Sequence, residues 1–414
     1  MSDPVCLIEN DETNQLSINM EALQILTSIT EPLVVVAIVG KYRTGKSYLM
    51  NNLAGCNKGF PLASTIQSKT KGIWMWCIPH PLKDRHVLVL LDTEGLGDVE
   101  KGDSKNDAWI FCLAVLLSSN FVFNSMGTID QQAMEQLHYV TELTKRIRLQ
   151  ASQEDEFNIS ECKRVSPSFT WCVRDFTLDL ILDGKEITED EYLTISLNKD
   201  TQCKKIEDYN LPRRCIQQYF HSHKCFVFVT PVIPRKLKNL ENLTIDELDE
   251  EFVAQSKSFC KYIFRSGSIK TLPGAIVVNG RMLGNLAVSY VEAIKSGSVP
   301  CMENAVVALA ESENIQAVKD ALTKYNTEMN KHVRKFPTET ELEFFQLHME
   351  CEKIALELFL ARSFKDNEQK HQLSEVSLER SESSLYNDTK HDKFSKCKKR
   401  QYMILHIKQT IPLH

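Results

Sequence analysis

A loop of eight residues near the N-terminus limits the folds open to this chain more than any other feature. Residues 40–47 are Gly-Lys-Tyr-Arg-Thr-Gly-Lys-Ser, and this G-x-x-x-x-G-K-S pattern surrounds a chain of phosphates with backbone N–H groups. The apolar run 33–39 is typical of a buried parallel strand, and residues 48–53 can begin a helix whose N-terminus faces the phosphates. In this context the pattern predicts a nucleoside-triphosphate site. The alternative is a glycine-containing turn that matches by accident.

A second short motif supports the first. The β-rich run 86–91 leads into Asp92-Thr93-Glu94-Gly95. In P-loop GTPases, D-x-x-G at a strand end puts a carboxylate near Mg²⁺ and a glycine N–H near the γ-phosphate. The same pattern also forms ordinary turns. Its place about 50 residues after the phosphate loop, on a strand expected beside that loop, favours the nucleotide interpretation.

Asp175 is the candidate for recognising the base. It follows Arg174 at the C-terminal end of the apolar strand 169–173, the end at which an open α/β sheet binds ligands. One carboxylate can accept hydrogen bonds from both the N1–H and the 2-amino group of guanine, whereas adenine offers no such pair, so Asp175 argues against an ATPase. The alternative is an ordinary ion pair at the strand end. Residues 198–200, Asn-Lys-Asp, resemble a guanine motif but lack its intervening residue, so we interpret them as a solvated loop.

Strands alternate with helices over residues 1–300, which predicts a doubly wound α/β P-loop GTPase domain. The apolar run 109–117 fits either a sheet element or a buried helix. The other expected elements are paired strands at 73–78 and 86–91, a helical stretch at 128–147, a core strand at 225–229 and a last strand at 274–278.

The composition changes after residue 300, and we expect the start of an all-α helical domain at 301–365, then a disordered tail at 366–414. Thr338 and Glu341 form a capping box at the start of the second helix. Apolar residues recur at helical spacing on both helices: Val306, Leu309, Val318, Leu322, Tyr325 and Met329 on the first, and Leu342, Phe345, Met349, Ala355 and Phe359 on the second. We expect both stripes to be buried.

Composition and charge argue against several other classes of protein. A net charge of -6 argues against non-specific nucleic-acid binding, and no apolar run reaches the roughly 18 residues of a membrane-spanning helix. The acidic N-terminus carries no secretion signal, and the 13 cysteines show no C-x-x-C pair and no alternation with histidine at metal-ligand spacing. The expectation is a reduced, cytoplasmic protein with no transmembrane segment and no nucleic-acid partner.

Together the motifs resemble those of the guanylate-binding proteins, interferon-inducible large GTPases of innate immune defence that are related to the dynamin superfamily. The likeness is carried by the segments 41–47, 64–77, 88–107 and 174–176. It extends from about Pro4 to about Asp366.

The resemblance implies a substrate, a metal and a role for each matching residue. GTP would be the substrate and Mg²⁺ the cofactor, with the metal held by Ser47, Thr70 and Asp92. Catalysis would involve Arg43 as an arginine finger supplied in cis, Lys46 on the β- and γ-phosphates, Thr70, and Ser68 with Glu94 to position the attacking water. The residues expected to contact the nucleotide are Gly40, Lys41, Tyr42, Arg43, Thr44, Gly45, Lys46, Ser47, Leu62, Ala63, Ser64, Asp92, Thr93, Glu94, Gly95, Leu96, Arg174 and Asp175.

The resemblance also implies partners. Two GTPase domains would dimerise face to face, as a homodimer or as a mixed dimer with family members, and hydrolysis in some members continues from GDP to GMP. Recruitment to vesicles or pathogen-containing compartments would be indirect. The alternative function is a catalytically weak nucleotide-binding module that regulates full-length family members by mixed dimerisation.

The chain departs from the family pattern at several positions. Lys41 replaces a usual Leu, Lys69 a usual His or Glu, Cys172 a usual Thr, and Val229-Thr230 a usual Asp-Arg. The chain ends in Ile-Pro-Leu-His without a C-a-a-X prenylation box. We therefore expect a C-terminally truncated or alternatively spliced form.

Overall fold

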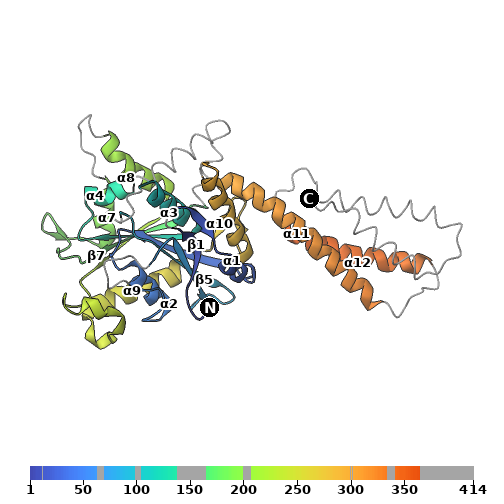
Figure 1. Ribbon diagram of the computed structural model, residues 1–414, viewed down its shortest axis with the longest axis horizontal. Coiled ribbons are helices and arrows are strands. Elements are labelled where there is room, and N and C mark those ends of the chain that lie inside the picture. The colour runs from blue at the N-terminus through green and yellow to red at the C-terminus, as the bar shows by residue number, and fades with distance from the viewer. Residues whose placement is uncertain are drawn as a thin grey trace. The chain divides into compact units, whose positions relative to one another are not determined.

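The computed structural model describes residues 1–11, 13–62, 70–97, 104–137, 165–198, 207–298, 300, 302–332 and 341–363. The chain divides into two compact units, Met1–Met302 and Glu303–His414. Figure 1 shows the helices and strands of each unit.

The first unit is built on one eight-stranded sheet in the order β10-β7-β6-β3-β5-β4-β1-β2. The strands from β10 to β5 run parallel, and β4, β1 and β2 add antiparallel pairs at one side. In chain order they are β1 (Val5–Asn10), β2 (Leu16–Ile18), β3 (Leu33–Gly40), β4 (Ile73–Pro79), β5 (Val87–Thr93), β6 (Asn120–Met126), β7 (Ser168–Arg174) and β10 (His223–Phe228).

Helices cover both faces of this sheet (Figure 1). On one face α2 packs against β3 and β5 while α9 packs against β10; on the other face α3 packs against β3 and β5, and α10 packs against α3 and α1. The helices of the unit are α1 (Met20–Thr27), α2 (Lys46–Ala54), α3 (Ser104–Leu117), α4 (Gln131–Gln136), α7 (Glu189–Asn198), α8 (Glu207–Tyr219), α9 (Glu250–Ser266) and α10 (Gly280–Lys295). A sheet covered on both faces explains why every residue of β3 is buried and nearly every one is apolar.

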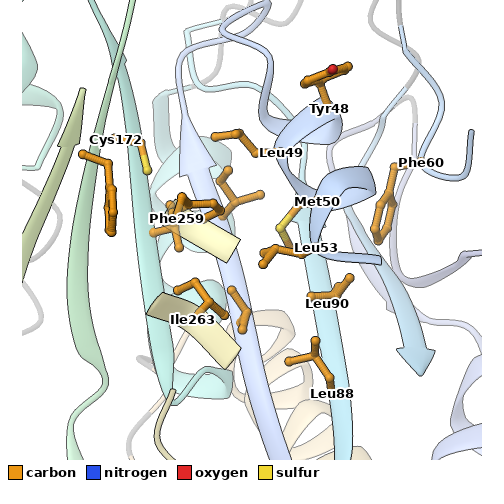
Figure 2. Close-up of a cluster of buried hydrophobic side chains, with 14 of the residues drawn as sticks. Tyr48, Leu49, Met50, Leu53, Phe60, Leu88, Leu90, Cys172, Phe259 and Ile263 are labelled. Carbon is orange, nitrogen blue, oxygen red and sulfur yellow. The ribbon is translucent and has the colours of Figure 1, made fainter. Parts of the chain in front are cut away.

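The core beneath the phosphate loop lies between the sheet and the helices α2 and α9. Figure 2 shows Leu49, Met50 and Leu53 of α2 facing Leu88 and Leu90 of β5, with Phe259 and Ile263 of α9 in the same cluster. These side chains are almost completely buried. The helix that follows the phosphate loop is therefore anchored on the sheet by its apolar face, which holds the loop in place.

Most expected elements are present, and the differences have local causes. The runs 73–78 and 86–91 form the antiparallel pair β4 and β5, and the run 109–117 is helical, within α3. The expected strand 274–278 was wrong: only Ile276–Val277 forms a strand, β12, which pairs with β11 (Thr271–Leu272) in a separate two-stranded sheet. Gly274 and Ala275 have φ values of +83° and +59°, which turn the chain back on itself. Of the expected helix 128–147, residues 131–136 form α4, and residues 138–147 lie outside the described ranges.

The described residues of the second unit belong mainly to two antiparallel helices, α11 (Met302–Lys331) and α12 (Glu341–Arg362). Their contact is lined by Ala317, Val318, Ala321, Tyr325, Met329, Cys351, Ala355 and Phe359. Within it the hydroxyl of Tyr325 lies 2.7 Å from Nδ1 of His348. Thr338 of the expected capping box lies outside the described residues, which resume at Glu341, the first residue of α12.

The stripe expected on the second helix was partly wrong. Phe345 and Met349 are each 55% exposed, whereas Ala355 and Phe359 are buried as expected. The buried face follows His348, Cys351, Ala355 and Phe359 at helical spacing. Because α12 carries apolar residues on two sides, spacing alone did not distinguish the side that packs. Among the described helices of both units, none is long and apolar enough to cross a bilayer.

Candidate nucleotide site

The phosphate loop connects β3 to α2 in a conformation that depends on its glycines. A Cβ on Gly40 would lie 2.0 Å from the carbonyl oxygen of Asn124 on the neighbouring strand β6, so no side chain fits there. Gly45 has a φ of +80° and directly precedes α2, whose first residue is Lys46. The first N–H groups of α2 are therefore directed at the loop, as anion binding at a helix N-terminus requires.

Lys46 holds a positive charge inside this loop. Its side chain is buried, and its Nζ donates to the carbonyl oxygen of Lys41 at 3.2 Å. Burial lowers the pKa of Lys46 to about 8, and the carboxylates of Asp92, Glu94 and Asp107 oppose that shift. An ammonium group enclosed by a loop of this shape is suited to bind phosphate oxygens.

Ser47 and Asp92 meet next to Lys46. The Ser47 hydroxyl donates to Oδ2 of Asp92 at 2.6 Å, and Asp92 is fully buried. Burial raises the pKa of Asp92 to about 6, while Lys46 and hydrogen bonds from Ser47 and Thr70 act in the opposite direction. The three residues expected to hold a metal are thus together, although they come from α2, β5 and the chain before β4.

The oxygen atoms of this group fit Mg²⁺. Oδ1 of Asp92 is buried and has no hydrogen-bond partner among the described residues. A buried carboxylate oxygen without a partner is costly, and a hard divalent cation with oxygen ligands would compensate it. A carboxylate with one or two hydroxyls matches the way Mg²⁺ binds beside nucleotide phosphates.

Glu94 lies deep in the protein, with 1% of its surface exposed. Its Oε1 accepts from the side-chain amide of Asn10 at 2.9 Å, and its Oε2 accepts from the N–H of Gly72 at 2.6 Å. The expected contact with an attacking water remains a prediction. The structure shows a carboxylate that the first strand and the start of β4 hold in one orientation.

The residues around Glu94 join the two motifs through the backbone. The N–H of Leu96 donates to the carbonyl of Gly40 at 3.1 Å, and the N–H of Tyr42 donates to the carbonyl of Leu96 at 3.2 Å. Gly95 packs so closely that a Cβ would lie 2.2 Å from Tyr42. The Thr93 hydroxyl donates to the Ile38 carbonyl, so it forms a contact between strands β5 and β3 of the sheet. The D-x-x-G segment and the phosphate loop are therefore joined by backbone hydrogen bonds and close packing.

The middle of the loop carries exposed cations. Lys41 and Arg43 are exposed, and Arg43 has a φ of +62°, a left-handed conformation that is rare for a residue with a side chain. The Arg43 guanidinium lies 6.0 Å from the centre of the Tyr42 ring. Thr44 is buried and donates its hydroxyl to the Lys41 carbonyl at 2.8 Å. The loop thus presents Arg43 outward, where a second domain or a phosphate can meet it.

Arg174 and Asp175 both lie at the end of β7, in different surroundings. The buried Arg174 guanidinium lies 5.3 Å from the ring centres of Phe228 and Phe252, and its Nη1 donates to the Gly45 carbonyl at 3.4 Å. Arg174 therefore holds the phosphate loop through a hydrogen bond to the backbone of Gly45. Asp175 is half-buried, and its φ of +52° lies in the left-handed region. The backbone therefore turns at Asp175 and leaves the direction of the strand. The expected contacts of Arg174 and Asp175 with guanine remain predictions.

Several expected site residues cannot be placed. Ala63, Ser64, Ser68 and Lys69 lie outside the described residues, as do Lys199 and Asp200 of the Asn-Lys-Asp segment. Leu62 is half-buried against the core cluster of α2 and α9.

Three asparagines of the site were missed by the sequence reasoning. Asn124 donates its amide to the Thr44 carbonyl at 2.8 Å, which fixes the phosphate loop from the neighbouring strand β6. Asn10 donates its amide to Glu94 and is itself bonded to Asn106. The signal that could have found Asn10 and Asn124 is a polar side chain at or near the end of an otherwise apolar strand, and this signal is weak without knowledge of strand order.

Comparisons with known proteins are consistent with this geometry. A family model described as the guanylate-binding protein N-terminal domain matches residues 13–272, and one described as the guanylate-binding protein C-terminal domain matches residues 274–411. Guanylate-binding protein 1 of Homo sapiens is 58% identical over 371 residues, which is 88% of this chain and 62% of that protein. Guanylate-binding protein 1 of Mus musculus is 55% identical over 376 residues, which is 90% of this chain and 63% of that protein.

The chain thus spans less than two thirds of the length of these curated relatives. Among solved structures, a small GTPase Arl6 from Trypanosoma brucei covers 57% of this chain at 12% identity with a TM-score of 0.27, an overlap too low to support an argument.

Proposed function

The chain belongs to the guanylate-binding protein family, and we propose that it binds GTP with Mg²⁺ and hydrolyses the γ-phosphate to give GDP. The observation that carries the proposal is the group of Lys46, Ser47 and Asp92 under the phosphate loop, in which a buried oxygen of Asp92 has no partner in the described chain. Residues 1–300 would form the GTPase domain, and residues 301–365 the start of a helical domain.

Each part of the loop has a task in holding the phosphates. The N–H groups at the start of α2 and the Lys46 ammonium would bind the β- and γ-phosphate oxygens. Ser47, Thr70 and Asp92 would hold Mg²⁺, which when bound neutralises part of the phosphate charge. Asp92 would stay ionised in this arrangement, because a cation at its free oxygen lowers the pKa that burial raises.

The base would be recognised by Asp175. Its carboxylate lies at the C-terminal end of β7, two strands from the phosphate loop strand β3, at the edge where ligands bind to open parallel sheets. Two guanine donors match one carboxylate, and adenine lacks them. Asp175 thus supports GTP over ATP as the substrate.

Hydrolysis would use the positive charge of Arg43, which belongs to the phosphate loop itself. Arg43 is exposed on the phosphate loop, so it would stabilise the transition state when a second GTPase domain covers it. Ser68 and Glu94 would position the attacking water. Family membership supports dimerisation with a second copy or with a relative, and a role in interferon-induced defence in the cytoplasm. A further step from GDP to GMP would be detected as a second product.

A binding titration tests the nucleotide and metal parts of this proposal. Fluorescent GTP, GDP and ATP are titrated with and without Mg²⁺ into the wild-type chain and into Ser47→Asn. We expect GTP to bind more tightly than ATP by at least about tenfold, since unpaired polar groups in the base site cost a few kcal/mol. Ser47→Asn should weaken GTP more than GDP, because the triphosphate complex depends more on the metal. Equal affinity for GTP and ATP would contradict the proposed base site.

Turnover separates the proposed enzyme from a regulatory binding module. A chain that binds GTP tightly and dimerises, yet releases no phosphate at saturating GTP, would act by mixed dimerisation with full-length relatives. Phosphate release that exceeds the background of a Lys46→Ala control supports the enzyme.

A further inference from the structure

Three buried polar side chains connect the first strand of the sheet to the D-x-x-G segment. Asn10, Glu94 and Asn106 are exposed by only 7%, 1% and 2%. The Asn10 amide nitrogen lies 2.9 Å from Oε1 of Glu94 and 3.1 Å from Oδ1 of Asn106. They come from the end of β1, the segment after β5 and the start of α3, so 84 and 96 residues separate Asn10 from its two partners.

The chemistry of these groups permits one orientation of Asn10. An ionised carboxylate only accepts hydrogen bonds, so Asn10 must present its NH₂ group to Glu94 and its oxygen elsewhere. That oxygen accepts from the Asn106 amide at 3.1 Å, and the same amide donates to the Asn14 carbonyl at 2.9 Å. Asn106 therefore orients Asn10, and Asn10 in turn orients Glu94.

Gly72 holds the other oxygen of Glu94. Its N–H donates to Oε2 at 2.6 Å, and its carbonyl accepts from the backbone N–H of Glu94 at 2.9 Å. Gly72 has a φ of +73°, and a Cβ there would lie 2.0 Å from the carbonyl oxygen of Ile8 on β1. The first strand therefore contacts Gly72, which binds one oxygen of the Glu94 carboxylate, and it carries Asn10, which binds the other oxygen.

These contacts are close to the chemistry of the proposed site. Glu94 comes two residues after Asp92, and Gly72 two residues after Thr70. A shift of β1 would move the Glu94 carboxylate. It would also move the two segments that carry Asp92 and Thr70, which are expected metal ligands. Misplacement of a reacting group by about 1 Å reduces enzymatic rates by up to about a hundredfold.

We infer that Asn10 is a positioning residue for hydrolysis: through its amide the first strand fixes the Glu94 carboxylate, with Asn106 holding the amide in place. The inference rests on the proposed GTPase function. It adds to that function a requirement for the N-terminal strand, which contains none of the nucleotide motifs.

The first test compares two alanine variants from the same N-terminal segment. Asn10→Ala removes the donor to Glu94. Asn19→Ala is the matched control, because Asn19 caps α1 through the N–H groups of Glu21 and Ala22, bonds Glu9 at an exposed position and is not bonded to Glu94. We expect Asn10→Ala to lower the single-turnover rate by at least about tenfold with the GTP dissociation constant changed by less than about threefold. Asn19→Ala should keep both values within about threefold.

A second measurement does not depend on hydrolysis. Hydrogen exchange of the Gly72 amide in the nucleotide-free chain reports whether Glu94 is held, because this N–H is bonded to its carboxylate. We expect Asn10→Ala and Asn106→Ala to speed this exchange by at least about tenfold, and Asn19→Ala to leave it unchanged. Asn106→Ala also covers the case in which Asn10→Ala does not fold.

The possible outcomes are distinct. An unchanged rate in Asn10→Ala, or a loss of rate matched by an equal loss of GTP affinity, overturns the inference. Unchanged Gly72 exchange in both Asn10→Ala and Asn106→Ala also overturns it. A wild-type chain that hydrolyses no GTP refutes the proposed function and with it any role of Asn10 in catalysis, while the exchange data still decide whether Asn10 holds Glu94.

Discussion

At the scale of residues, the site concentrates buried charge. Burial lowers the pKa of Lys46 to about 8 and raises that of Asp92 to about 6, so both groups are less easily ionised than they would be in water. Phosphate oxygens beside Lys46 and a divalent cation beside Asp92 would each favour the charged form. Binding of the nucleotide and the metal would therefore favour the charged forms that burial disfavours.

The base preference depends on one carboxylate in the proposed site. Asp175→Asn replaces an acceptor oxygen by an NH₂ group that faces the 2-amino group of guanine, which leaves buried polar groups unpaired; xanthine carries an acceptor oxygen at that position. GTP affinity should fall by at least about tenfold, and xanthosine triphosphate should bind the variant better than GTP does. Fluorescence titration with both nucleotides measures this. Unchanged GTP affinity would show that guanine is recognised elsewhere.

Arg43 should affect the rate and not the affinity. An arginine finger is worth roughly three to five orders of magnitude in rate in other GTPases, through charge in the transition state. Arg43→Ala should therefore abolish measurable hydrolysis while the GTP dissociation constant stays within about threefold. If a second domain completes the site, wild-type activity per molecule rises with protein concentration and the variant shows no such slope. A flat wild-type activity over about a hundredfold range, in a protein shown to be monomeric, would contradict dimer-assisted hydrolysis.

Residues of the site that could be predicted from the sequence are those close together along the chain. The loop spacing identified Gly40, Lys46 and Ser47, and D-x-x-G identified Asp92, because a strand, turn and helix determine where these groups point. Asn10 and Asn124 were not predicted, because their hydrogen-bond partners lie about 80 residues away along the chain and are brought close only by the order of the strands. The position of Arg174 under the loop depends on Phe228 and Phe252, which no local pattern connects to it.

At the scale of elements, α3 shows how a buried lysine side chain can end a helix. Lys270 is 1% exposed, and its Nζ donates to the carbonyl oxygens of Leu116 and Ser118 at 2.9 and 2.8 Å. These carbonyls lie at the C-terminal end of α3, where intrahelical partners run out. The contact connects the chain before β11 to the helix that covers β3 and β5.

Lys270 predicts a pH dependence of stability. Burial lowers its pKa to about 7, against an ordinary 10.5. Between these values the unfolded chain holds the proton and the folded chain does not, so this group makes the folded state more stable as the pH rises. Relative to Lys270→Met, the wild-type free energy of unfolding should increase from pH 7 to pH 9 by at most about 1.4 kcal/mol per pH unit. Urea unfolding of both proteins measures this difference, and a constant difference would contradict a neutral Lys270.

The two phenylalanines of α12 test which side of that helix packs. Phe359 is 1% exposed and Phe345 is 55% exposed on the same helix. Phe359→Ala should destabilise the contact of α11 and α12 by about 3–5 kcal/mol, and Phe345→Ala by less than about 0.5 kcal/mol. Hydrogen exchange of the α11 amides reports the local stability. Equal effects of the two substitutions would contradict this assignment, because they would mean that the stripe with Phe345 and Met349 packs as well.

At the scale of the whole molecule, the chain divides into a unit built on a mixed sheet and a unit in which two helices are described. The element types of the first unit followed from the alternation of apolar runs and turns, since a parallel sheet covered on both faces needs such runs. The pairing of β1 with β2 and β4 could not be predicted from the sequence, because a short antiparallel strand carries little information about which strands lie beside it. In the second unit the helices were foreseen but one buried face was not, because α12 is apolar on two sides.

The central claim is that this chain hydrolyses GTP at the site of Lys46 and Asp92. Single-turnover hydrolysis with excess protein and Mg²⁺, run side by side on GTP and ATP with GDP and GMP resolved, tests it most directly, and Lys46→Ala serves as the control. We expect GTP to be converted to GDP, ATP to remain intact over the same time, and Lys46→Ala to show neither binding nor conversion. Equal hydrolysis of the two nucleotides, or wild-type activity in Lys46→Ala, would contradict the account.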